Sequence, residues 1–234
     1  MYKHFKSVAL LIWLSLFLFG CSSQPKQVQL PPEPETVVEE STLEKVERLY
    51  GQQAAARVKY WQELIDSAPR LEERDKLSQV NQFFNGARFL DDSEIWGESN
   101  YWATPMEFLI LDAGDCEDFA CAKYFTLLEM GVEIDKLRLI HCKASSLDKA
   151  HMVLAYYLAP DAMPLILDNL KDEILAADQR LDLTPVYSFN GKDLWLAKSR
   201  FQYEKAGDIK TQKRWQALQE RVKSGEVPVL VIKE

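Results

Sequence analysis

The chain has 234 residues, which suits one folded domain plus an export segment. Hydrophobic residues make up 47% and charged residues 27%, a balance typical of a globular protein and not of a disordered or collagen-like one. With a formal net charge of −8, the chain lacks the excess of Lys and Arg that displaces counterions from a phosphate backbone. We therefore expect no nucleic-acid partner.

The first twenty residues have the pattern of a signal peptide. Residues 3–6 supply a basic start, and residues 8–19 form an apolar run broken only by Ser15. This run is short for a transmembrane helix, which needs about 20 apolar residues. It ends in Leu-Phe-Gly-Cys, which resembles a bacterial lipobox. We therefore predict a signal peptide at 1–20, lipidation of Cys21 and export to the periplasm as a membrane-anchored lipoprotein, with an uncleaved anchor as the alternative.

Residues 21–40, which include the lipobox cysteine, are rich in Pro, Glu and Gln. Such a composition cannot build a hydrophobic core and favours extended structure. We predict that this segment is a tether. It would hold a folded domain, residues 41–234, away from the membrane to which Cys21 is attached.

Helical patterns fill the first part of the domain. A capping box at Ser41-Thr42-Leu43-Glu44 predicts a helix that runs to about Ile65, although Gly51 weakens its middle. A second helix is predicted from Leu71 to about Phe84. The Asn-Gly pair that follows it indicates a turn.

The next predicted helix carries a cysteine at its start. Residues 91–105 are aromatic and irregular. Gly114 and Asp115 then supply a turn and an N-cap for a helix that ends near Gly131. Cys116 therefore lies in the first turn of this helix.

Beyond Gly131 the apolar pattern changes to that of strands. Helices followed by sequential antiparallel strands indicate an α+β domain. The expected elements are strands at Leu137–Lys143, His151–Leu158, Pro164–Asp168 and Val186–Leu196, a helix at Trp215–Val222 and a closing strand at Val227–Ile232.

Cys116 is a candidate nucleophile. A thiol reacts as its thiolate, and the partial positive charge at a helix N-terminus favours that form. Taken alone this position is a weak signal, because most cysteines at helix starts are small apolar fillers. We assign that structural role to Cys121 and Cys142.

His151 and Asp168 are candidate partners of this cysteine. His151 begins one predicted strand and Asp168 ends the next, with a turn at 160–164 between them. If the hairpin folds about residue 161 or 162, the residue facing His151 falls at about 168 to 171, since paired positions in an antiparallel ladder have a nearly constant sum. A carboxylate on one imidazole nitrogen and a thiol facing the other is the arrangement that acyl transfer requires. The alternative is a solvated His and Asp at strand ends.

Several short motifs lie between residues 71 and 169. They are Asn81, Asn85, Tyr101–Pro105, Gly114–Ala120, Lys123-Tyr124, Gly131, Leu137-Arg138, Ala150–Leu154 and Leu167–Asn169. Together they resemble the bacterial transglutaminase-like cysteine proteinases, whose best-known members are the LapG periplasmic proteases. The match covers most of this stretch, and the combination of motifs is specific.

The resemblance implies a fold and a set of site residues. It implies that the α+β domain, with N-terminal helices followed by an antiparallel sheet, has a transglutaminase-like or papain-like cysteine proteinase fold. It also implies that Cys116 is the nucleophile, His151 the general base and Asp168 its orienting partner. LapG-type proteases depend on calcium, and Asp115 and Glu117 match their acidic residues implicated in calcium binding.

A substrate and a partner are implied in the same way. LapG-type proteases cut a very large repeat-containing adhesin near its N-terminus and so release biofilm cells from a surface. A membrane receptor for cyclic di-GMP sequesters them when attachment is favoured. By this resemblance we expect an adhesin as substrate, Ca²⁺ as cofactor and an inner-membrane cyclic di-GMP receptor as inhibitor.

The acidic residues beside Cys116 give a physical reason to expect a cation. Asp115, Glu117 and Asp118 would disfavour the thiolate by like-charge repulsion, and a bound calcium would cancel that repulsion. Two or three carboxylates supply only part of the roughly six to eight oxygens that calcium takes. Without the resemblance, an acidic first turn that complements the helix dipole explains the same residues.

Two other functions fit these residues. An amine could resolve the acyl-enzyme in place of water, which would make the protein a cross-linking enzyme. From another class, the chain could be a catalytically silent envelope lipoprotein that binds calcium or a protein partner. The presence of Cys116, His151 and Asp168 together favours the protease, since a scaffold has no need of all three.

Overall fold

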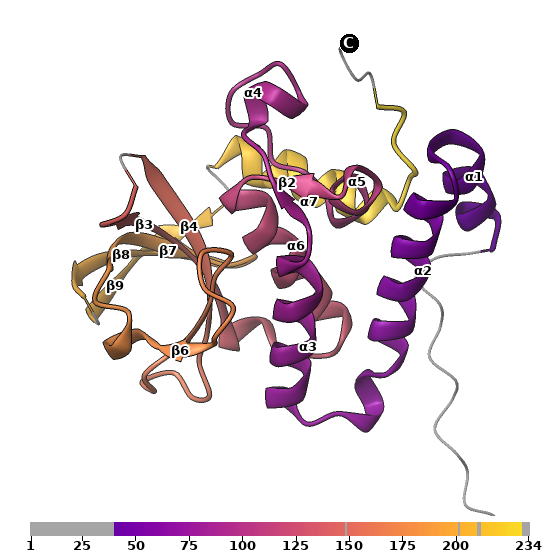
Figure 1. Cartoon of the computed structure of the whole chain (residues 1–234). Coiled ribbons are helices and arrows are strands. Elements are labelled where there is room, and N and C mark those ends of the chain that lie inside the picture. Colours follow the sequence, from indigo (N-terminus) through magenta and orange to yellow (C-terminus); the bar gives the residue numbers. More distant parts are fainter. Residues whose placement is uncertain (1–39, 148, 201, 210–211, 231–234) are drawn as a thin grey trace, which may run out of the picture. The chain divides into compact units, whose positions relative to one another are not determined.

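The computed structural model describes residues 40–147, 149–200, 202–209 and 212–230. The predicted signal peptide, Cys21 and nearly all of the predicted tether lie outside the described residues. None of the described helices is long and apolar enough to cross a membrane. Within the described part, helices are followed by strands, as the sequence predicts (Figure 1).

The first predicted helix is in fact two helices. α1 (Glu40–Tyr50) ends at Gly51, and α2 (Gln52–Asp66) begins directly after it. Gly51 has a φ of 85°, which glycine adopts at little cost and which interrupts a helix. Each helix still buries an apolar side, with Val46 and Val58 both 0% exposed.

Helix α6 lies at the centre of the helical part (Figure 1). α6 (Cys116–Glu129) packs against α3 (Glu73–Asn85) and α5 (Pro105–Leu111) and, on another side, against the sheet. Cys121 and Leu127, on different faces of α6, are both fully buried. Because α6 is covered on most sides, its first turn is held in place relative to the strands that carry the other site residues.

Two short strands shape the approach to α6. β1 (Arg88–Phe89) and β2 (Ala113–Gly114) pair in parallel. α4 (Asp92–Ile95) follows β1. Asp112, between α5 and β2, turns the chain with a left-handed φ of 54°. This pairing brings the segment after β1 next to the start of α6.

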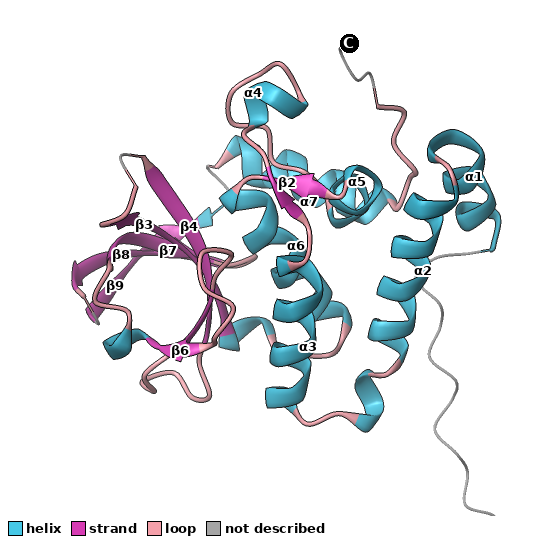
Figure 2. Cartoon of the chain, in the orientation of Figure 1, coloured by secondary structure: helices cyan, strands magenta, loops and turns pink. Residues whose placement is uncertain are grey.

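The remaining strands form a seven-stranded antiparallel sheet in the order β6-β5-β4-β3-β7-β8-β9 (Figure 2). The sheet curves, so that the ends of its two outer strands, β6 and β9, turn towards each other (Figure 2). At its centre, Cys142 of β3 pairs with His151 of β4. The strands are β3 (Leu137–Ala144), β4 (Ala150–Tyr156), β5 (Leu165–Leu167), β6 (Leu175–Ala176), β7 (Leu183–Phe189), β8 (Asp193–Ser199) and β9 (Gln202–Asp208).

Most of the predicted elements are present. The helices predicted from Leu71 and after Asp115 are α3 and α6, and the predicted helix Trp215–Val222 lies within α7 (Lys213–Ser224). The first three predicted strands correspond to β3, β4 and β5. Strand β9 was not expected, because its residues are mostly polar and show no alternation of apolar and polar positions. In the structure most of them are exposed.

The expected single strand Val186–Leu196 is wrong, because the chain reverses within it. Asn190 and Gly191 form the turn between β7 and β8. The side-chain oxygen of Asn190 accepts hydrogen bonds from the N–H groups of Lys192 and Asp193, at 2.8 and 2.9 Å. Such a side-chain bond to the backbone is how Asn stabilises turns.

The expected closing strand Val227–Ile232 is also wrong over its described part. Residues 227–230 form no strand, and the rest lies outside the described residues. The Tyr50 hydroxyl donates to the carbonyl of Pro228 and accepts a hydrogen bond from the N–H of Leu230 at 3.0 Å. These bonds tie the segment to α1 instead of to a sheet.

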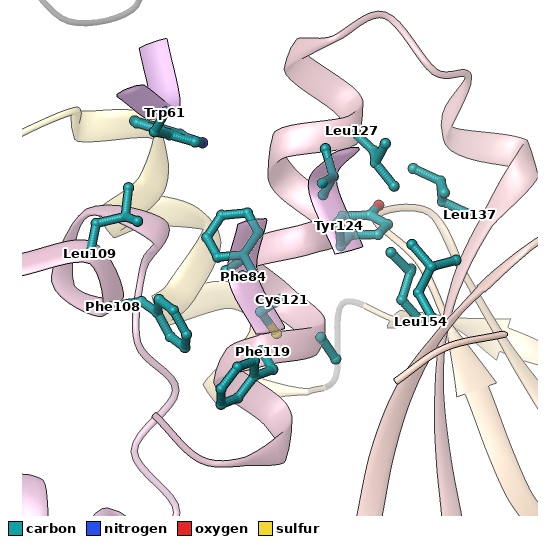
Figure 3. Close-up of a cluster of buried hydrophobic side chains, with 14 of the residues drawn as sticks. Trp61, Phe84, Phe108, Leu109, Phe119, Cys121, Tyr124, Leu127, Leu137 and Leu154 are labelled. Carbon is teal, nitrogen blue, oxygen red and sulfur yellow. The ribbon is translucent and has the colours of Figure 1, made fainter. Parts of the chain in front are cut away.

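A hydrophobic core fills the space between the helices and one face of the sheet (Figure 3). The rings of Phe84, Phe108 and Phe119 pack edge to face in a row, with centroids 5.5 and 4.9 Å apart. The one polar atom of the buried Trp61 is satisfied, since its Nε1 donates to Thr126 Oγ1 at 2.8 Å. Each such apolar side chain stabilises the fold by about 1.5–3 kcal/mol.

Candidate functional site

Cys116 is the first residue of α6, as the sequence predicts. Asp115 is the N-cap, and its Oδ1 accepts hydrogen bonds from the N–H groups of Glu117 and Asp118 at 3.2 and 3.5 Å. In return, Asp118 Oδ2 accepts from the Asp115 N–H at 3.3 Å. This capping box fixes the first turn of the helix. Cys116 is therefore held at a helix N-terminus, with 6% of its surface exposed.

Gly114 precedes this cap in a confined space. A Cβ at this position would lie 2.7 Å from Asp118 Cβ and 2.8 Å from Phe108 Cδ2. Both neighbours are buried and cannot move freely. Glycine is needed here because β2 approaches α6 and α5 too closely for any side chain.

We expect Gly114→Ala to destabilise the protein by about 1–3 kcal/mol, the usual cost of overpacking a buried site. Urea denaturation gives the free energy of unfolding that checks this. Gly86→Ala is the matched control, because a Cβ at Gly86 meets no atom closer than 3.4 Å. It should change stability by less than about 0.5 kcal/mol, and equal losses in the two variants would contradict the prediction.

The β4–β5 hairpin brings His151 and Asp168 into contact. The register pairs Leu154 with Leu167, so Asp168 follows β5 directly and lies near the start of β4. His151 Nε2 is 2.8 Å from Asp168 Oδ1, and each side chain is at most 1% exposed. The contact expected from the hairpin is present, in a site closed to bulk water.

Arg180 is a partner of Asp168 that sequence reasoning missed. Its Nη2 donates to Asp168 Oδ2 at 2.6 Å and to Asp182 Oδ2 at 2.8 Å. Burial alone would raise the pKa of Asp168, but its interaction with His151, followed by hydrogen bonds from the Leu170 N–H and from Arg180, lowers the pKa to about 2. Asp168 is therefore an ionised acceptor that fixes the orientation of the His151 imidazole.

Cys116 and His151 line the same cavity, which has a volume of about 290 Å³. Because Nε2 of His151 is engaged by Asp168, its Nδ1 is the free nitrogen, and Nδ1 has no hydrogen-bond partner among the described residues. The backbone N–H of Met152, the residue after His151, faces the Cys116 thiol and acts to lower its pKa. The cysteine thus lies against β4 and lines the same cavity as His151.

The Cys116 thiol is held in its protonated form in this arrangement. Burial raises its pKa well above the ordinary value, and the carboxylates of Glu117 and Asp115 raise it further. The thiol donates a hydrogen bond to Glu117 Oε2 at 2.8 Å. The repulsion expected from the sequence is present, and neutralising these carboxylates would favour the thiolate.

The acidic cluster contains a carboxylate that sequence reasoning missed. Asp92, Asp115 and Asp118 each place an oxygen within 4.8 Å of the others, and Glu117 lies in an equally close group with Asp115 and Cys116. Asp92 Oδ1 is buried and has no hydrogen-bond partner within the described part of the chain. Asp92 comes from the irregular stretch 91–105, whose fold no periodic pattern revealed.

These carboxylates repel one another. Burial raises the pKa of Asp92 to about 6. Burial, together with the charges of neighbouring carboxylates, also raises the pKa of Asp115 and Asp118. An all-oxygen set with an unpartnered oxygen fits a hard divalent cation, because such a cation prefers carboxylate oxygens and offsets their repulsion.

A buried network positions the backbone of Asp168. Lys123 Nζ donates to the Oδ1 atoms of Asn81 and Asn85 at 2.8 and 2.6 Å. Asn85 Nδ2 in turn donates to the carbonyl of Asp168 and to Asp172 Oδ1, both at 2.9 Å. Motif residues from α3 and α6 therefore hold the loop that follows β5.

We expect the stability of wild-type protein relative to Lys123→Met to increase as the pH rises from about 7 to about 10. Burial lowers the pKa of Lys123 from 10.5 to about 7. The unfolded chain therefore binds more protons in this window, and raising the pH favours the folded state. Urea denaturation at several pH values checks this. Lys192→Met, at a side chain 52% exposed, should show no such trend, and a constant difference for Lys123→Met would contradict the prediction.

Other residues singled out in the sequence lie as follows. Cys121 and Cys142 are buried free cysteines, in keeping with a structural role. Trp102, from a motif, stacks on Phe189 with ring centroids 6.0 Å apart and does not line the cavity. His141 does line the cavity, as a half-buried wall residue.

Comparison with known proteins decides the family. Residues 52–182, more than half of the chain, match the family model described as bacterial transglutaminase-like cysteine proteinase. The chain belongs to this family. A search of curated proteins gives no match.

This cysteine proteinase is similar to solved structures of LapG from Legionella pneumophila. The EGTA-treated form is 43% identical, with 77% of this chain and 97% of that chain covered and a TM-score of 0.67. The calcium-bound form is 42% identical, with 76% and 98% covered and a TM-score of 0.65. The predicted family and the predicted transglutaminase-like α+β fold are confirmed.

Proposed function

We propose that this cysteine proteinase is an endopeptidase in which Cys116 is the nucleophile, His151 the general base and Asp168 the residue that orients the imidazole. The observation that carries the proposal is the 2.8 Å contact between His151 Nε2 and Asp168 Oδ1. This contact leaves His151 Nδ1 without a hydrogen-bond partner among the described residues, and His151 and Cys116 line one cavity. Such a nucleophile, base and orienting acid are what acyl transfer requires.

The proposed reaction has two stages. His151 takes the proton of the Cys116 thiol, and the thiolate attacks the carbonyl carbon of the scissile peptide bond. The imidazolium, held by the ionised Asp168, then gives its proton to the leaving amine. Water deprotonated by His151 hydrolyses the acyl-enzyme and restores the thiol. The backbone N–H of Cys116, in the first turn of α6, would stabilise the oxyanion.

We propose in addition that calcium binds beside Cys116. The predicted ligands Asp115 and Glu117 lie next to Asp92 and Asp118. The unpartnered Oδ1 of Asp92 supports this site, as does the similarity to LapG structures described as calcium-bound and EGTA-treated. Bound calcium would supply the positive charge that offsets the carboxylates now raising the pKa of Cys116.

The proposed substrate is a large repeat-containing surface adhesin that is cut near its N-terminus. Release of the adhesin would promote biofilm dispersal, and an inner-membrane cyclic di-GMP receptor is the proposed inhibitor. Support comes from the similarity to LapG. The proposed location is the periplasm, with a signal peptide at 1–20, lipid on Cys21, a tether at 21–40 and the protease domain at 41–234. A tethered protease suits a substrate held at the same membrane.

Cleavage of the N-terminal segment of a co-occurring large adhesin tests this function. Purified residues 22–234 are incubated with the segment, in calcium and in EGTA, and the products are identified by mass spectrometry. Cleavage that requires calcium supports the proposal. Incorporation of a labelled amine would identify a cross-linking enzyme instead, and an intact segment under both conditions would contradict the proposed substrate.

A further inference from the structure

The sheet curves on its side away from α6 (Figure 2). On this side lies a second cavity, lined by residues of β3, β8 and β9 and of the segment between β4 and β5. Its volume is about 490 Å³, within the range of small-molecule sites. None of its lining residues belongs to the cavity of Cys116. The polar and aromatic side chains of its wall are Arg138, Tyr157, Asp161, Trp195, Arg200, Tyr203 and Lys205.

Arg138 is held in an unusual setting for a cation. Its guanidinium carbon lies 4.4 Å from the ring centroid of Tyr157 and 4.1 Å from that of Trp195. The two rings keep water from the faces of the guanidinium and fix its position, so its edge remains for hydrogen bonds. Arg138 Nε is buried and has no hydrogen-bond partner, and no carboxylate of the described residues pairs with Arg138.

The charges around this cavity are not balanced. Lys205 pairs with Asp193 at 2.7 Å. Arg200, by contrast, makes only a long hydrogen bond of 3.5 Å to the carbonyl of Arg180, and no carboxylate in the described part of the chain pairs with it. Asp161, the carboxylate of this wall, is exposed, and no described contact pairs it with either arginine. Two guanidinium groups thus face one cavity without a paired carboxylate among the described residues, in a chain whose net charge is −8.

A smaller adjoining hollow adds an independent observation. It shares Ile140, Ala177, Arg200 and Tyr203 with the larger cavity, and Arg180 forms part of its wall. Arg180 is 1% exposed, yet its Nη1 has no hydrogen-bond partner among the described residues. A buried donor without a partner costs about 1–3 kcal/mol, and folded proteins rarely leave one unsatisfied. An acceptor supplied by a ligand at these hollows would satisfy such a donor.

We propose that this cavity binds a small ligand in which an oxyanion, phosphate or carboxylate, is attached to an aromatic or apolar body. The oxyanion lies against Arg138 and Arg200, because the planar guanidinium fork matches both anions with paired hydrogen bonds. The body of the ligand packs on Trp195 and Tyr203. The proposal does not rest on the proposed protease function, since none of the residues that line this cavity lines the cavity of Cys116.

Isothermal titration calorimetry on the purified full-length chain in a non-ionic detergent tests the site. Phenyl phosphate and benzoate are the probes, and benzyl alcohol is the neutral comparison. We expect saturable binding of at least one anion and none of the alcohol. Tighter binding of phenyl phosphate would indicate a phosphate-bearing ligand, and tighter binding of benzoate a carboxylate.

Variants assign the binding to the cavity. Arg138→Gln should weaken the better anion by about tenfold or more, since a paired charge-assisted bond is lost. Arg200→Gln, at a half-buried side chain, is the second variant and keeps the test decisive if β3 does not tolerate the first. Lys192→Gln, at a cation paired with Asp135 elsewhere, should bind as the wild type does. No saturable binding of either anion, or equal binding by all variants, would overturn the proposal.

Discussion

The Cys116→Ala protein is expected to lose adhesin cleavage by at least about 10,000-fold in kcat/KM, because no other group can form the acyl-enzyme. The 2.8 Å contact between His151 and Asp168 does not involve the thiol. The variant therefore removes the nucleophile and leaves the base and its orienting partner in place. The fold should persist, since the change removes one small buried side chain. Rates measured with the adhesin segment, together with the thermal unfolding midpoint, check both statements.

Cys121→Ala is the matched control for this variant. Cys121 lies on the same helix and is 0% exposed in the hydrophobic core, away from the cavity. Its loss should cost about 1 kcal/mol of stability and leave kcat/KM within about threefold of the wild type. Residual cleavage by Cys116→Ala at a rate close to the wild type would remove Cys116 from the mechanism. Equal loss in both variants would show that the assay reports folding instead of chemistry.

The placement of the three catalytic candidates was predictable because each has a strong local signal. Asp115 caps α6 with its own side chain, which fixes Cys116 at the helix start. The short β4–β5 hairpin fixes which residues face each other, and so brings Asp168 to His151. Both features depend on residues close in sequence, where turn and cap preferences carry most of the information.

The missed residues depend on contacts between distant segments. Arg180 reaches Asp168 from a loop that follows a 3-10 helix, and nothing in its neighbours indicates a buried cation. Asp92 reaches Asp115 because two-residue strands pair, and strands this short leave no apolar pattern. Lys123 and Asn81 were recognised as motif residues, but their hydrogen bond was not predicted. Lysine side chains are rarely buried, so nothing in the sequence indicated that this one is.

The errors in the elements have a different cause. Gly51 and Asn190-Gly191 are residues that commonly end a helix or a strand. The prediction gave more weight to the apolar pattern on both sides and continued the element through them. Gly51 has a positive φ, and Asn190 closes a hairpin with its side chain. In both cases one or two residues with special backbone preferences decided where an element ended, while the surrounding residues would have allowed it to continue.

Removal of calcium with EGTA should abolish cleavage and lower the thermal unfolding midpoint, and the loss of stability should grow with pH. In the metal-free protein, burial raises the pKa of Asp92 to about 6, and burial with mutual repulsion raises the pKa of Asp115 and Asp118. A carboxyl whose folded pKa is raised binds more protons in the folded state than in the unfolded state. Stability of the chelated protein therefore falls as the pH rises from about 4 through these folded pKa values.

Calcium bound at the proposed site would reverse this trend, because it would bind the ionised carboxylates and release their protons. Calorimetry at about pH 5 and about pH 8, with calcium and with EGTA, should show the larger calcium-dependent stabilisation at the higher pH. Asp92→Asn should weaken calcium binding by about tenfold or more, whereas Asp135→Asn, at a side chain 71% exposed, should not. Full cleavage in EGTA, or a stabilisation equal at both pH values, would contradict a calcium site in this cluster. The acidic residues would then act only as the helix cap and as the charges that hold Cys116 protonated.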